Sequence, residues 1–230
     1  MSEIVLSGYY GFGNAGDEAM LLSILEAIER ERPGSSVTVI SGRPEDTEKK
    51  YQVKAVHRFD YIGMIGALRK ADLLLSGGGS LLQDVTSRRS IFYYLSIIKL
   101  AQWLKVPTML FAQGIGPVVR PTARKALCCV VNQVDLITVR DEKSRSELIE
   151  LGVTKPPIHV TADPVLSLKP ESGEYGEALL EKIGYVKGKK LIGFAIRDWP
   201  LVPEYLDEIA KTADLLLADE EVQLVFLPMQ

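Results

Sequence analysis

The chain has 230 residues, of which 47% are hydrophobic and 25% are charged, and its formal net charge is −3. These values are ordinary for a globular protein, and the slight negative charge argues against a nucleic-acid-binding protein, which usually carries a basic patch. The two cysteines, Cys128 and Cys129, are adjacent in an apolar helical stretch. They predict no disulfide framework and indicate a reducing compartment.

Nothing at the start of the chain resembles a secretory signal peptide, because residues 1–3 lead directly into a short strand without a basic segment. No apolar run reaches the roughly 18 residues that a membrane-spanning helix requires. We therefore expect a cytoplasmic protein, with peripheral contact to a membrane left open.

Short apolar runs alternate with helical patterns over residues 4–168. Strands are predicted at residues 4–7, 37–40, 53–57, 73–76, 109–112, 136–139 and 158–161. Helices are predicted at residues 18–31, 62–70, 88–105, 122–131 and 141–151. This alternation predicts a parallel sheet with helices on both faces. Six of the strands end in glycines or polar residues, and ligands bind outside the carboxyl ends of parallel strands, so one edge of the sheet should carry the function.

The pattern changes after Leu168. Residues 169–189 are expected to form a linker around one short helix. Strands at 191–196 and 222–227, with a helix from about Pro203 to Ala218, then begin a second unit. Two strands and one helix bury too little to form a core. We therefore expect residues 1–168 to form a Rossmann-like N-terminal domain and residues 190–230 to be the incomplete start of a second one, in the front part of a longer protein.

A glycine-rich loop follows the first strand. Residues 11–16 satisfy the pattern G-x-G-x-x-G, which is typical of dinucleotide binding. However, residues 8–10 separate the loop from its strand, and the second strand ends in Ser41-Gly42-Arg43 instead of an acidic residue. Arg43 keeps an NADP site open, because an arginine there accommodates a 2′-phosphate.

The helix after this loop begins with two carboxylates, Asp17 and Glu18. They suit the positive end of the helix dipole but would oppose a phosphate docked there. The loop therefore favours a neutral, polyhydroxylated ligand.

Three consecutive glycines, Gly77, Gly78 and Gly79, follow the strand at 73–76 and precede Ser80. Each glycine costs chain entropy, so the run favours a binding role in which a Cβ, for example at Gly78, would block the ligand. Arg88 and Arg89 are expected to begin the next helix, where the dipole disfavours cations, so they either bind an anion or are solvated.

Arg140 ends another strand and is followed by Asp141. Arginine suits a bidentate grip on a carboxylate or phosphate, and the alternative is a salt bridge to a neighbouring loop. Asp141 is expected to cap its helix, with Ser144 as the alternative cap. His57, beside Arg58 at a strand end, is a weaker candidate for ligand contact. No spacing resembles a zinc site or a P-loop, so no metal is predicted.

Five blocks in this order resemble the polysaccharide pyruvyl transferase family: residues 9–18, residues 76–84, residues 113–117, Arg140-Asp141 with Ser144, and residues 162–164. The resemblance covers most of residues 4–168. It is closest to the branch that pyruvylates the secondary cell-wall polysaccharide of Gram-positive bacteria, a modification that anchors S-layer proteins.

The resemblance implies a fold similar to the two-domain GT-B glycosyltransferases, with the acceptor on the side of the N-terminal domain. It implies transfer of a pyruvyl group from phosphoenolpyruvate to two hydroxyls of N-acetylmannosamine in a lipid-linked saccharide, without a further cofactor. The family also uses basic residues of the second domain, including a histidine, that would lie beyond Gln230. We therefore expect the 230-residue chain alone to lack a complete donor site and to be inactive.

The roles expected on this basis fall into three groups. The donor would be bound by Arg140, Arg88 and Arg89. Asp17 and Asp84 are the candidates for the catalytic carboxylate. The acceptor would be bound by Gly11, Gly13, Asn14, Gly16, Gly77, Gly78, Gly79, Ser80, Gln113 and Gly114.

Three other functions stay open on the residues alone. They are a nucleotide-sugar glycosyltransferase of GT-B fold, a sugar- or nucleotide-binding module without catalysis, and an NADP-binding protein. Release of phosphate from phosphoenolpyruvate in the presence of an acceptor would separate the pyruvyl transferase from all of them. The oligomeric state stays open too.

Overall fold

A computed structural model describes residues 2–85, 87–170, 172–197 and 204–229. The chain divides into two compact units, Met1–Leu168 and Lys169–Gln230. Pro203, where a helix was predicted to begin, lies outside the described residues. None of the helices in the described part of the chain combines the length and the apolar character that a membrane-crossing helix requires.

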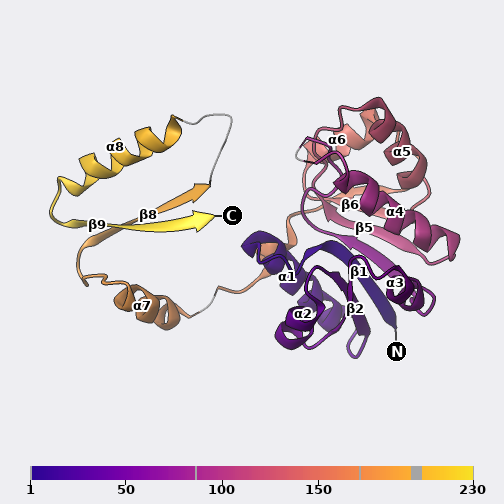
Figure 1. The fold of residues 1–230 in the computed structure, drawn as a ribbon, viewed down its shortest axis with the longest axis horizontal. Coiled ribbons are helices and arrows are strands. Elements are labelled where there is room, and N and C mark those ends of the chain that lie inside the picture. The colour runs from indigo at the N-terminus through magenta and orange to yellow at the C-terminus, as the bar shows by residue number, and fades with distance from the viewer. Residues whose placement is uncertain (1, 86, 171, 198–203, 230) are drawn as a thin grey trace. The chain divides into compact units, whose positions relative to one another are not determined.

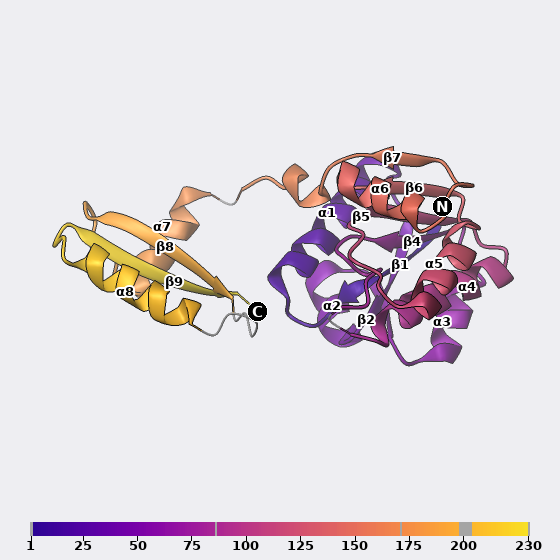
Figure 2. The ribbon, with the colours of Figure 1, turned by 90° about the horizontal axis from the view of Figure 1, so that it is seen from above.

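The first unit is a seven-stranded, wholly parallel sheet with the strand order β3-β2-β1-β4-β5-β6-β7. Its strands are β1 (Glu3–Tyr10), β2 (Ser36–Ser41), β3 (Lys54–His57), β4 (Leu73–Gly77), β5 (Thr108–Gln113), β6 (Leu136–Val139) and β7 (Ile158–Val160). Its helices are α1 (Ala15–Glu31), α2 (Pro44–Tyr51), α3 (Tyr61–Leu68), α4 (Ser90–Trp103), α5 (Pro121–Val131), α6 (Glu142–Glu150) and the short 3-10 helix η1 (Pro164–Ser167). Figures 1 and 2 show this sheet enclosed by helices.

Two hydrophobic clusters, one on each face, explain the alternating side chains of the central strands. Leu74 of β4 packs with α3, α4, α5 and Leu148 of α6, whereas its neighbour Leu75 packs with α1. The same alternation separates Val5 from Leu6 in β1. Successive side chains of a strand point to opposite faces, so a strand covered on both sides becomes a continuous apolar run. The prediction of helices on both faces is confirmed.

Helix α2 was not predicted. Its signal is the proline at the first helical position, Pro44, followed by Glu45 and Asp46 in the first turn. Helix α4 begins two residues later than expected, so Arg88 and Arg89 precede it instead of forming its first turn. The backbone N–H of Arg89 donates to the hydroxyl of Ser87 at 3.3 Å, which belongs to a turn before the helix.

The chain reverses its direction of winding between β1 and β4. It proceeds from β1 outward to β3, and then returns to place β4 on the other side of β1. In open parallel sheets the ligand crevice lies at this switch point. Two strands also change register as they reach the edge, β1 between Ser7 and Tyr10 and β5 between Leu110 and Gln113. Such bulges redirect the residues that follow.

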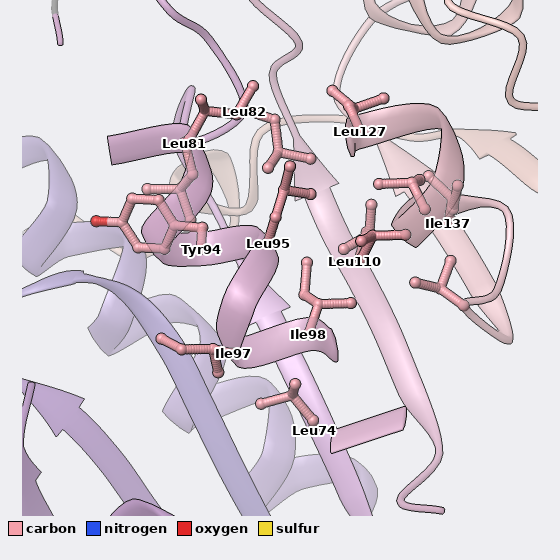
Figure 3. Packing of buried hydrophobic residues seen from close by; sticks show 14 of the residues in the cluster. Leu74, Leu81, Leu82, Tyr94, Leu95, Ile97, Ile98, Leu110, Leu127 and Ile137 are labelled. Carbon is pink, nitrogen blue, oxygen red and sulfur yellow. The ribbon is translucent and has the colours of Figure 1, made fainter. Parts of the chain in front are cut away.

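The loop after the triple glycine is anchored in the core. Figure 3 shows Leu81 and Leu82 among the side chains that pack with Tyr94 and Leu95 of α4. Leu82 also pairs with Ile115 in an isolated parallel bridge, which joins the loops after β4 and β5. The glycine turn is therefore held on both sides by buried residues.

The second unit contains α7 (Gly173–Lys182), β8 (Lys190–Arg197), α8 (Tyr205–Leu217) and β9 (Val222–Met229), with β8 and β9 paired in parallel. Among its described side chains, only Ala213 and Val222 are buried apolar residues. Leu215 is 77% exposed and Phe226 is 52% exposed. This unit therefore buries little apolar surface by itself.

Candidate functional site

The loop that follows β1 is held by contacts within the chain. The backbone N–H of Gly11 donates to the Glu18 carboxylate at 2.9 Å, and Asn14 caps α1 by accepting from the backbone N–H of Asp17 at 3.1 Å. Gly11 has φ +78, and a Cβ there would overlap the Ser41 hydroxyl. Gly11 is therefore needed for packing, whereas a Cβ on Gly13 would meet no atom within 4 Å. Of the predicted acceptor residues in this loop, Gly13 is the one with open space around it.

Glu18 locks this loop to α2. Its carboxylate accepts a hydrogen bond from the Tyr51 hydroxyl at 2.6 Å and lies 3.6 Å from the Lys50 ammonium group. Burial and then the bond to Glu18 raise the pKa of the Tyr51 hydroxyl, so Tyr51 stays a hydrogen-bond donor. Glu18 is thereby satisfied without a ligand.

The triple glycine lies against α1, and its three residues differ in role. A Cβ on Gly77 would lie 2.8 Å from the Ile24 side chain, and a Cβ on Gly78 would overlap Met20. These two positions are glycines because the turn packs tightly on α1. The expectation that a Cβ on Gly78 would chiefly block a ligand is thus revised. At Gly79, in contrast, a Cβ would lie 3.2 Å from the Asp17 carboxylate.

Asp17 is the carboxyl group most altered by this environment. Burial, and secondly the nearby charge of Glu18, raise the pKa of Asp17 to about 6. The group is about half-buried, beside the Gly79 turn. A carboxyl with such a pKa carries its charge near neutral pH and still binds a proton readily, which is what a general base in a polar reaction needs.

Arg140 lies on the other side of the same turn. Its guanidinium donates to the Ser80 hydroxyl at 3.2 Å and to the Asp163 carboxylate at 3.3 Å, and it lies 3.6 Å from Asp141. A Cβ on Gly114 would lie 2.7 Å from the guanidinium, so the absence of a side chain at Gly114 leaves room for Arg140. The structure therefore shows the alternative role of Arg140, a salt bridge to a neighbouring loop, in a side chain that is about one-third exposed, and donor binding by Arg140 stays a prediction.

The carboxylate of Asp84 lies elsewhere, tied into the loop after β5. It accepts backbone N–H groups from Val119 and Arg120, both at 2.9 Å, and pairs with the Arg120 guanidinium at 3.5 Å. Burial by itself would raise the pKa of Asp84, but these bonds together hold it below its usual value. With both oxygens engaged and the side chain buried, Asp84 fits a structural role better than the catalytic one expected from the sequence.

Three further predicted residues do not reach the turn between Asp17 and Arg140. Gln113 is fully buried, and its amide nitrogen donates to the Ser76 carbonyl at 3.2 Å, so it supports the strand ends from beneath. Arg88 and Arg89 are exposed, and no ion pair is recorded for either within the described residues. This geometry favours solvated side chains for Arg88 and Arg89 over the binding of an anion.

The sequence did not single out Arg58, which the structure surrounds with aromatic rings. Its guanidinium lies 4.6 Å from the Tyr93 ring and 5.2 Å from the Phe12 ring. The available signal was its place directly after β3, beside His57. The imidazole of His57 itself accepts the backbone N–H of Phe59 at 3.3 Å.

A pocket of about 540 Å³ lies between α1 and α2. Its lining includes Gly13, Glu18, Arg43 and Lys50, but neither Asp17 nor Arg140. A phosphate held by the glycine loop and Arg43, as an NADP site would require, would lie here beside the Glu18 carboxylate. That like charge disfavours the dinucleotide alternative.

A family model described as polysaccharide pyruvyl transferase matches residues 14–230 of the chain. No curated protein matches the chain.

Several solved structures share the fold at low sequence identity. The Anabaena protein Alr3699/HepE in complex with UDP and glucose is 12% identical with a TM-score of 0.59, and the match covers 100% of this chain and 70% of that one. S. aureus MnaA in complex with UDP is 15% identical with a TM-score of 0.62, covering 99% and 62%. The wall teichoic acid polymerase TagF is 12% identical with a TM-score of 0.61, covering 98% and 55%. These matches bear on the fold alone, and they confirm the GT-B-like α/β class.

Proposed function

Because the chain belongs to the polysaccharide pyruvyl transferase family, we propose that it transfers the pyruvyl group of phosphoenolpyruvate to two hydroxyls of a sugar. The products would be a cyclic ketal and inorganic phosphate. We further propose that the sugar is N-acetylmannosamine in the lipid-linked precursor of a secondary cell-wall polysaccharide of a Gram-positive bacterium, the polysaccharide that anchors S-layer proteins. Such a substrate pair would place the reaction in the cytoplasm, at the inner face of the membrane.

One observation carries the proposal. The Gly79-Ser80 turn has a carboxylate with a raised pKa on one side, Asp17, and a guanidinium on the other, Arg140. The reaction needs both groups, because a hydroxyl must lose a proton and an anionic donor must be held beside it.

The chemistry assigns a role to each group. One sugar hydroxyl adds to C2 of phosphoenolpyruvate and its proton passes to Asp17, while an acid gives a proton to the methylene carbon, which becomes a methyl group. The second hydroxyl then bonds to C2 as the bond from C2 to the phosphate oxygen breaks, and its proton leaves with the inorganic phosphate. Arg140 would hold the carboxylate or the phosphate of the donor through parallel hydrogen bonds, which charged pairs make at about 1.5 to 3 kcal/mol net.

Assignment of the base to Asp17 rather than Asp84 follows from their surroundings. The Asp84 carboxylate is engaged by backbone N–H groups and by a guanidinium, so accepting a proton would cost those interactions. The Asp17 carboxylate is only half-buried and adjoins a glycine without a Cβ. We therefore assign the base to Asp17.

The experiment is release of phosphate from phosphoenolpyruvate by the full-length protein, measured with and without lipid-linked saccharide acceptors. We expect release only with an acceptor, and a ketal on the sugar by mass spectrometry. Consumption of a nucleotide sugar without phosphoenolpyruvate would instead identify a glycosyltransferase. Binding of sugars with no turnover of either donor would identify a binding module, and both outcomes would reject the proposal.

A further inference from the structure

Arg58 occupies a collar of three aromatic rings contributed by three separate segments. Its guanidinium carbon lies 5.2 Å from the centre of Phe12 in the loop after β1, 4.9 Å from Phe59, and 4.6 Å from Tyr93 on α4. Phe59 and Tyr93 also meet edge to face, with ring centres 6.4 Å apart. Cations over aromatic faces are stabilised by the ring quadrupole, and the rings keep water from the faces of the guanidinium.

The backbone of Arg58 is fixed on both sides. Its N–H donates to the carbonyl of Ser41 at 2.9 Å, which continues the β2–β3 ladder. Its carbonyl accepts the Tyr93 hydroxyl at 3.1 Å. The side chain is thus presented from a rigid position, which lowers the entropy that a bound group would have to overcome.

Unlike Arg120 and Arg140, Arg58 has no carboxylate partner among the described residues. Arg120 pairs with Asp84, and Arg140 pairs with Asp163. Its Nε atom is buried without a hydrogen-bond partner. The rings cover the faces of the guanidinium, so the donors in its plane are the groups that an anion would engage. A partly desolvated cation of this kind attracts an anion more strongly than a solvated one.

The ring of Tyr94 lies 5.1 Å from the ring of Tyr93 in the collar, and the hydroxyl of Tyr94 is influenced by both Arg58 and Asp17. Burial raises the pKa of the Tyr94 hydroxyl, the positive charge of Arg58 opposes that rise, and the negative charge of Asp17 adds to it. Tyr94 is therefore within electrostatic range of both groups. Since Arg58 follows β3 and Arg140 follows β6, the two arginines lie on opposite sides of the β1–β4 switch point.

We propose that Arg58, with the rings of Phe12, Phe59 and Tyr93, binds a phosphate group of the acceptor, so that hydroxyls of the attached saccharide reach Asp17. This inference rests on the proposed function and extends it. We place an anionic group of the donor at Arg140, across the switch point, and therefore assign the anion at Arg58 to the other substrate. A lipid-linked saccharide carries such a group in its phosphate linkage.

The first test is direct binding, with pyrophosphate as the probe in titration calorimetry on the full chain. Arg58→Gln should weaken pyrophosphate binding about ten- to a hundredfold, the range of one charged hydrogen-bonded contact. Arg69→Gln is the matched control, because Arg69 is exposed at the far end of α3 and its loss changes the net charge equally. If Arg58→Gln does not fold, Arg58→Lys supplies the same measurement. Its loss of pyrophosphate affinity should be smaller, because lysine keeps the positive charge and lacks only the planar set of guanidinium donors. Unchanged affinity in the folded variants would reject the proposal.

The second test separates the sources of the phosphate. With a diphosphate-bearing saccharide as acceptor, Arg58→Gln should raise its KM about tenfold or more and leave kcat nearly unchanged. With the methyl glycoside of the same saccharide, and for phosphoenolpyruvate, the KM values should stay as in the parent protein. A raised KM for phosphoenolpyruvate would show that Arg58 holds the donor, and equal effects on both acceptors would show a structural role; each contradicts the proposal. If the parent protein turns over no phosphoenolpyruvate at all, the proposed function fails, and the pyrophosphate titration still decides on Arg58.

Discussion

Replacing Asp17 by asparagine should abolish turnover and at the same time stabilise the fold near neutral pH. Loss of a general base lowers kcat by about a hundredfold or more. The gain in stability follows from the raised pKa of about 6, against an ordinary value of 3.8, because burying the charged form costs free energy that a neutral amide does not incur. Replacing a catalytic group that is held at a cost to stability makes the protein more stable, whereas replacing a structural group makes it less stable.

The size of the gain follows from the same two pKa values. Each pH unit between about 6 and 3.8 corresponds to about 1.4 kcal/mol, so the upper limit is about 3 kcal/mol. Solvent screens a half-buried group, which reduces this to about 1.5 kcal/mol. Loss of a negative charge from the first turn of α1 removes about 0.5 kcal/mol of interaction with the helix dipole. A net gain of about 1 kcal/mol remains.

The pH dependence of stability shows whether the charge of Asp17 stabilises or destabilises the fold. With a folded pKa above the unfolded one, the penalty of ionising Asp17 grows as pH rises from about 4 to about 6 and is constant above that. The advantage of Asp17→Asn should therefore be full at pH 7.5 and shrink as pH falls toward 4. In the parent protein, kcat/KM should rise with pH through about 6, because the base must be ionised.

Urea unfolding at several pH values and phosphate release from phosphoenolpyruvate measure the two effects. Asp46→Asn is the matched control, since Asp46 is an exposed carboxylate in the first turn of α2. It should lose a few tenths of a kcal/mol at most and keep full activity. If Asp17→Asn unfolds more easily than the parent at pH 7.5 and still turns over, Asp17 is a structural residue and the base must be sought elsewhere.

Three further substitutions test the rest of the site. Arg140→Lys should raise the KM for phosphoenolpyruvate about ten- to a hundredfold while sparing acceptor binding; an unchanged KM in a destabilised protein would make Arg140 a structural ion-pair partner. Asp84→Asn should cost about 1.5 to 3 kcal/mol in urea unfolding, because this buried side chain loses its charged hydrogen bonds to Val119 and Arg120, and it should leave activity per folded molecule intact. Gly78→Val should lower stability by about 3 kcal/mol, since φ is +68 and the new side chain would overlap Met20, whereas Gly66→Ala, with open space in α3, should be neutral or slightly stabilising by thermal melting.

Much of the first unit follows from the order of its apolar runs. Strands buried on both faces cannot alternate with polar residues, so runs such as residues 73–75 are readable without knowledge of the fold. The edge at which we propose the site was predicted in the same way, because glycines and polar residues follow six of the strands. Helix α2 was not predicted because residues 44–51 are nearly all polar. A helix that buries mainly Thr47 shows little apolar periodicity.

The roles of single residues could not be read in the same way. Asp17 and Asp84 both follow a glycine-rich loop in the sequence, and only the three-dimensional path of the loop after β5 shows that Asp84 is engaged by Val119 and Arg120. Gly78 and Gly79 are adjacent and both have positive φ, yet one faces a methionine and the other a carboxylate. Arg58 needs rings from two distant segments, so its collar exists only after folding.

The raised pKa of Asp17 depends on neighbours that serve no chemical step themselves. Glu18 is held close to Asp17 at the start of α1, because Gly11, Tyr51 and Lys50 all engage its carboxylate. The turn at Gly79 lies beside Asp17, and a side chain at residue 79 would approach the Asp17 carboxylate. Burial is the main cause of the raised pKa of Asp17, so a change that admits water to this carboxylate would lower the pKa. The glycine run and the acidic pair are separate motifs along the chain. In the folded protein they meet at the Asp17 carboxylate, to which we assign the proton transfer.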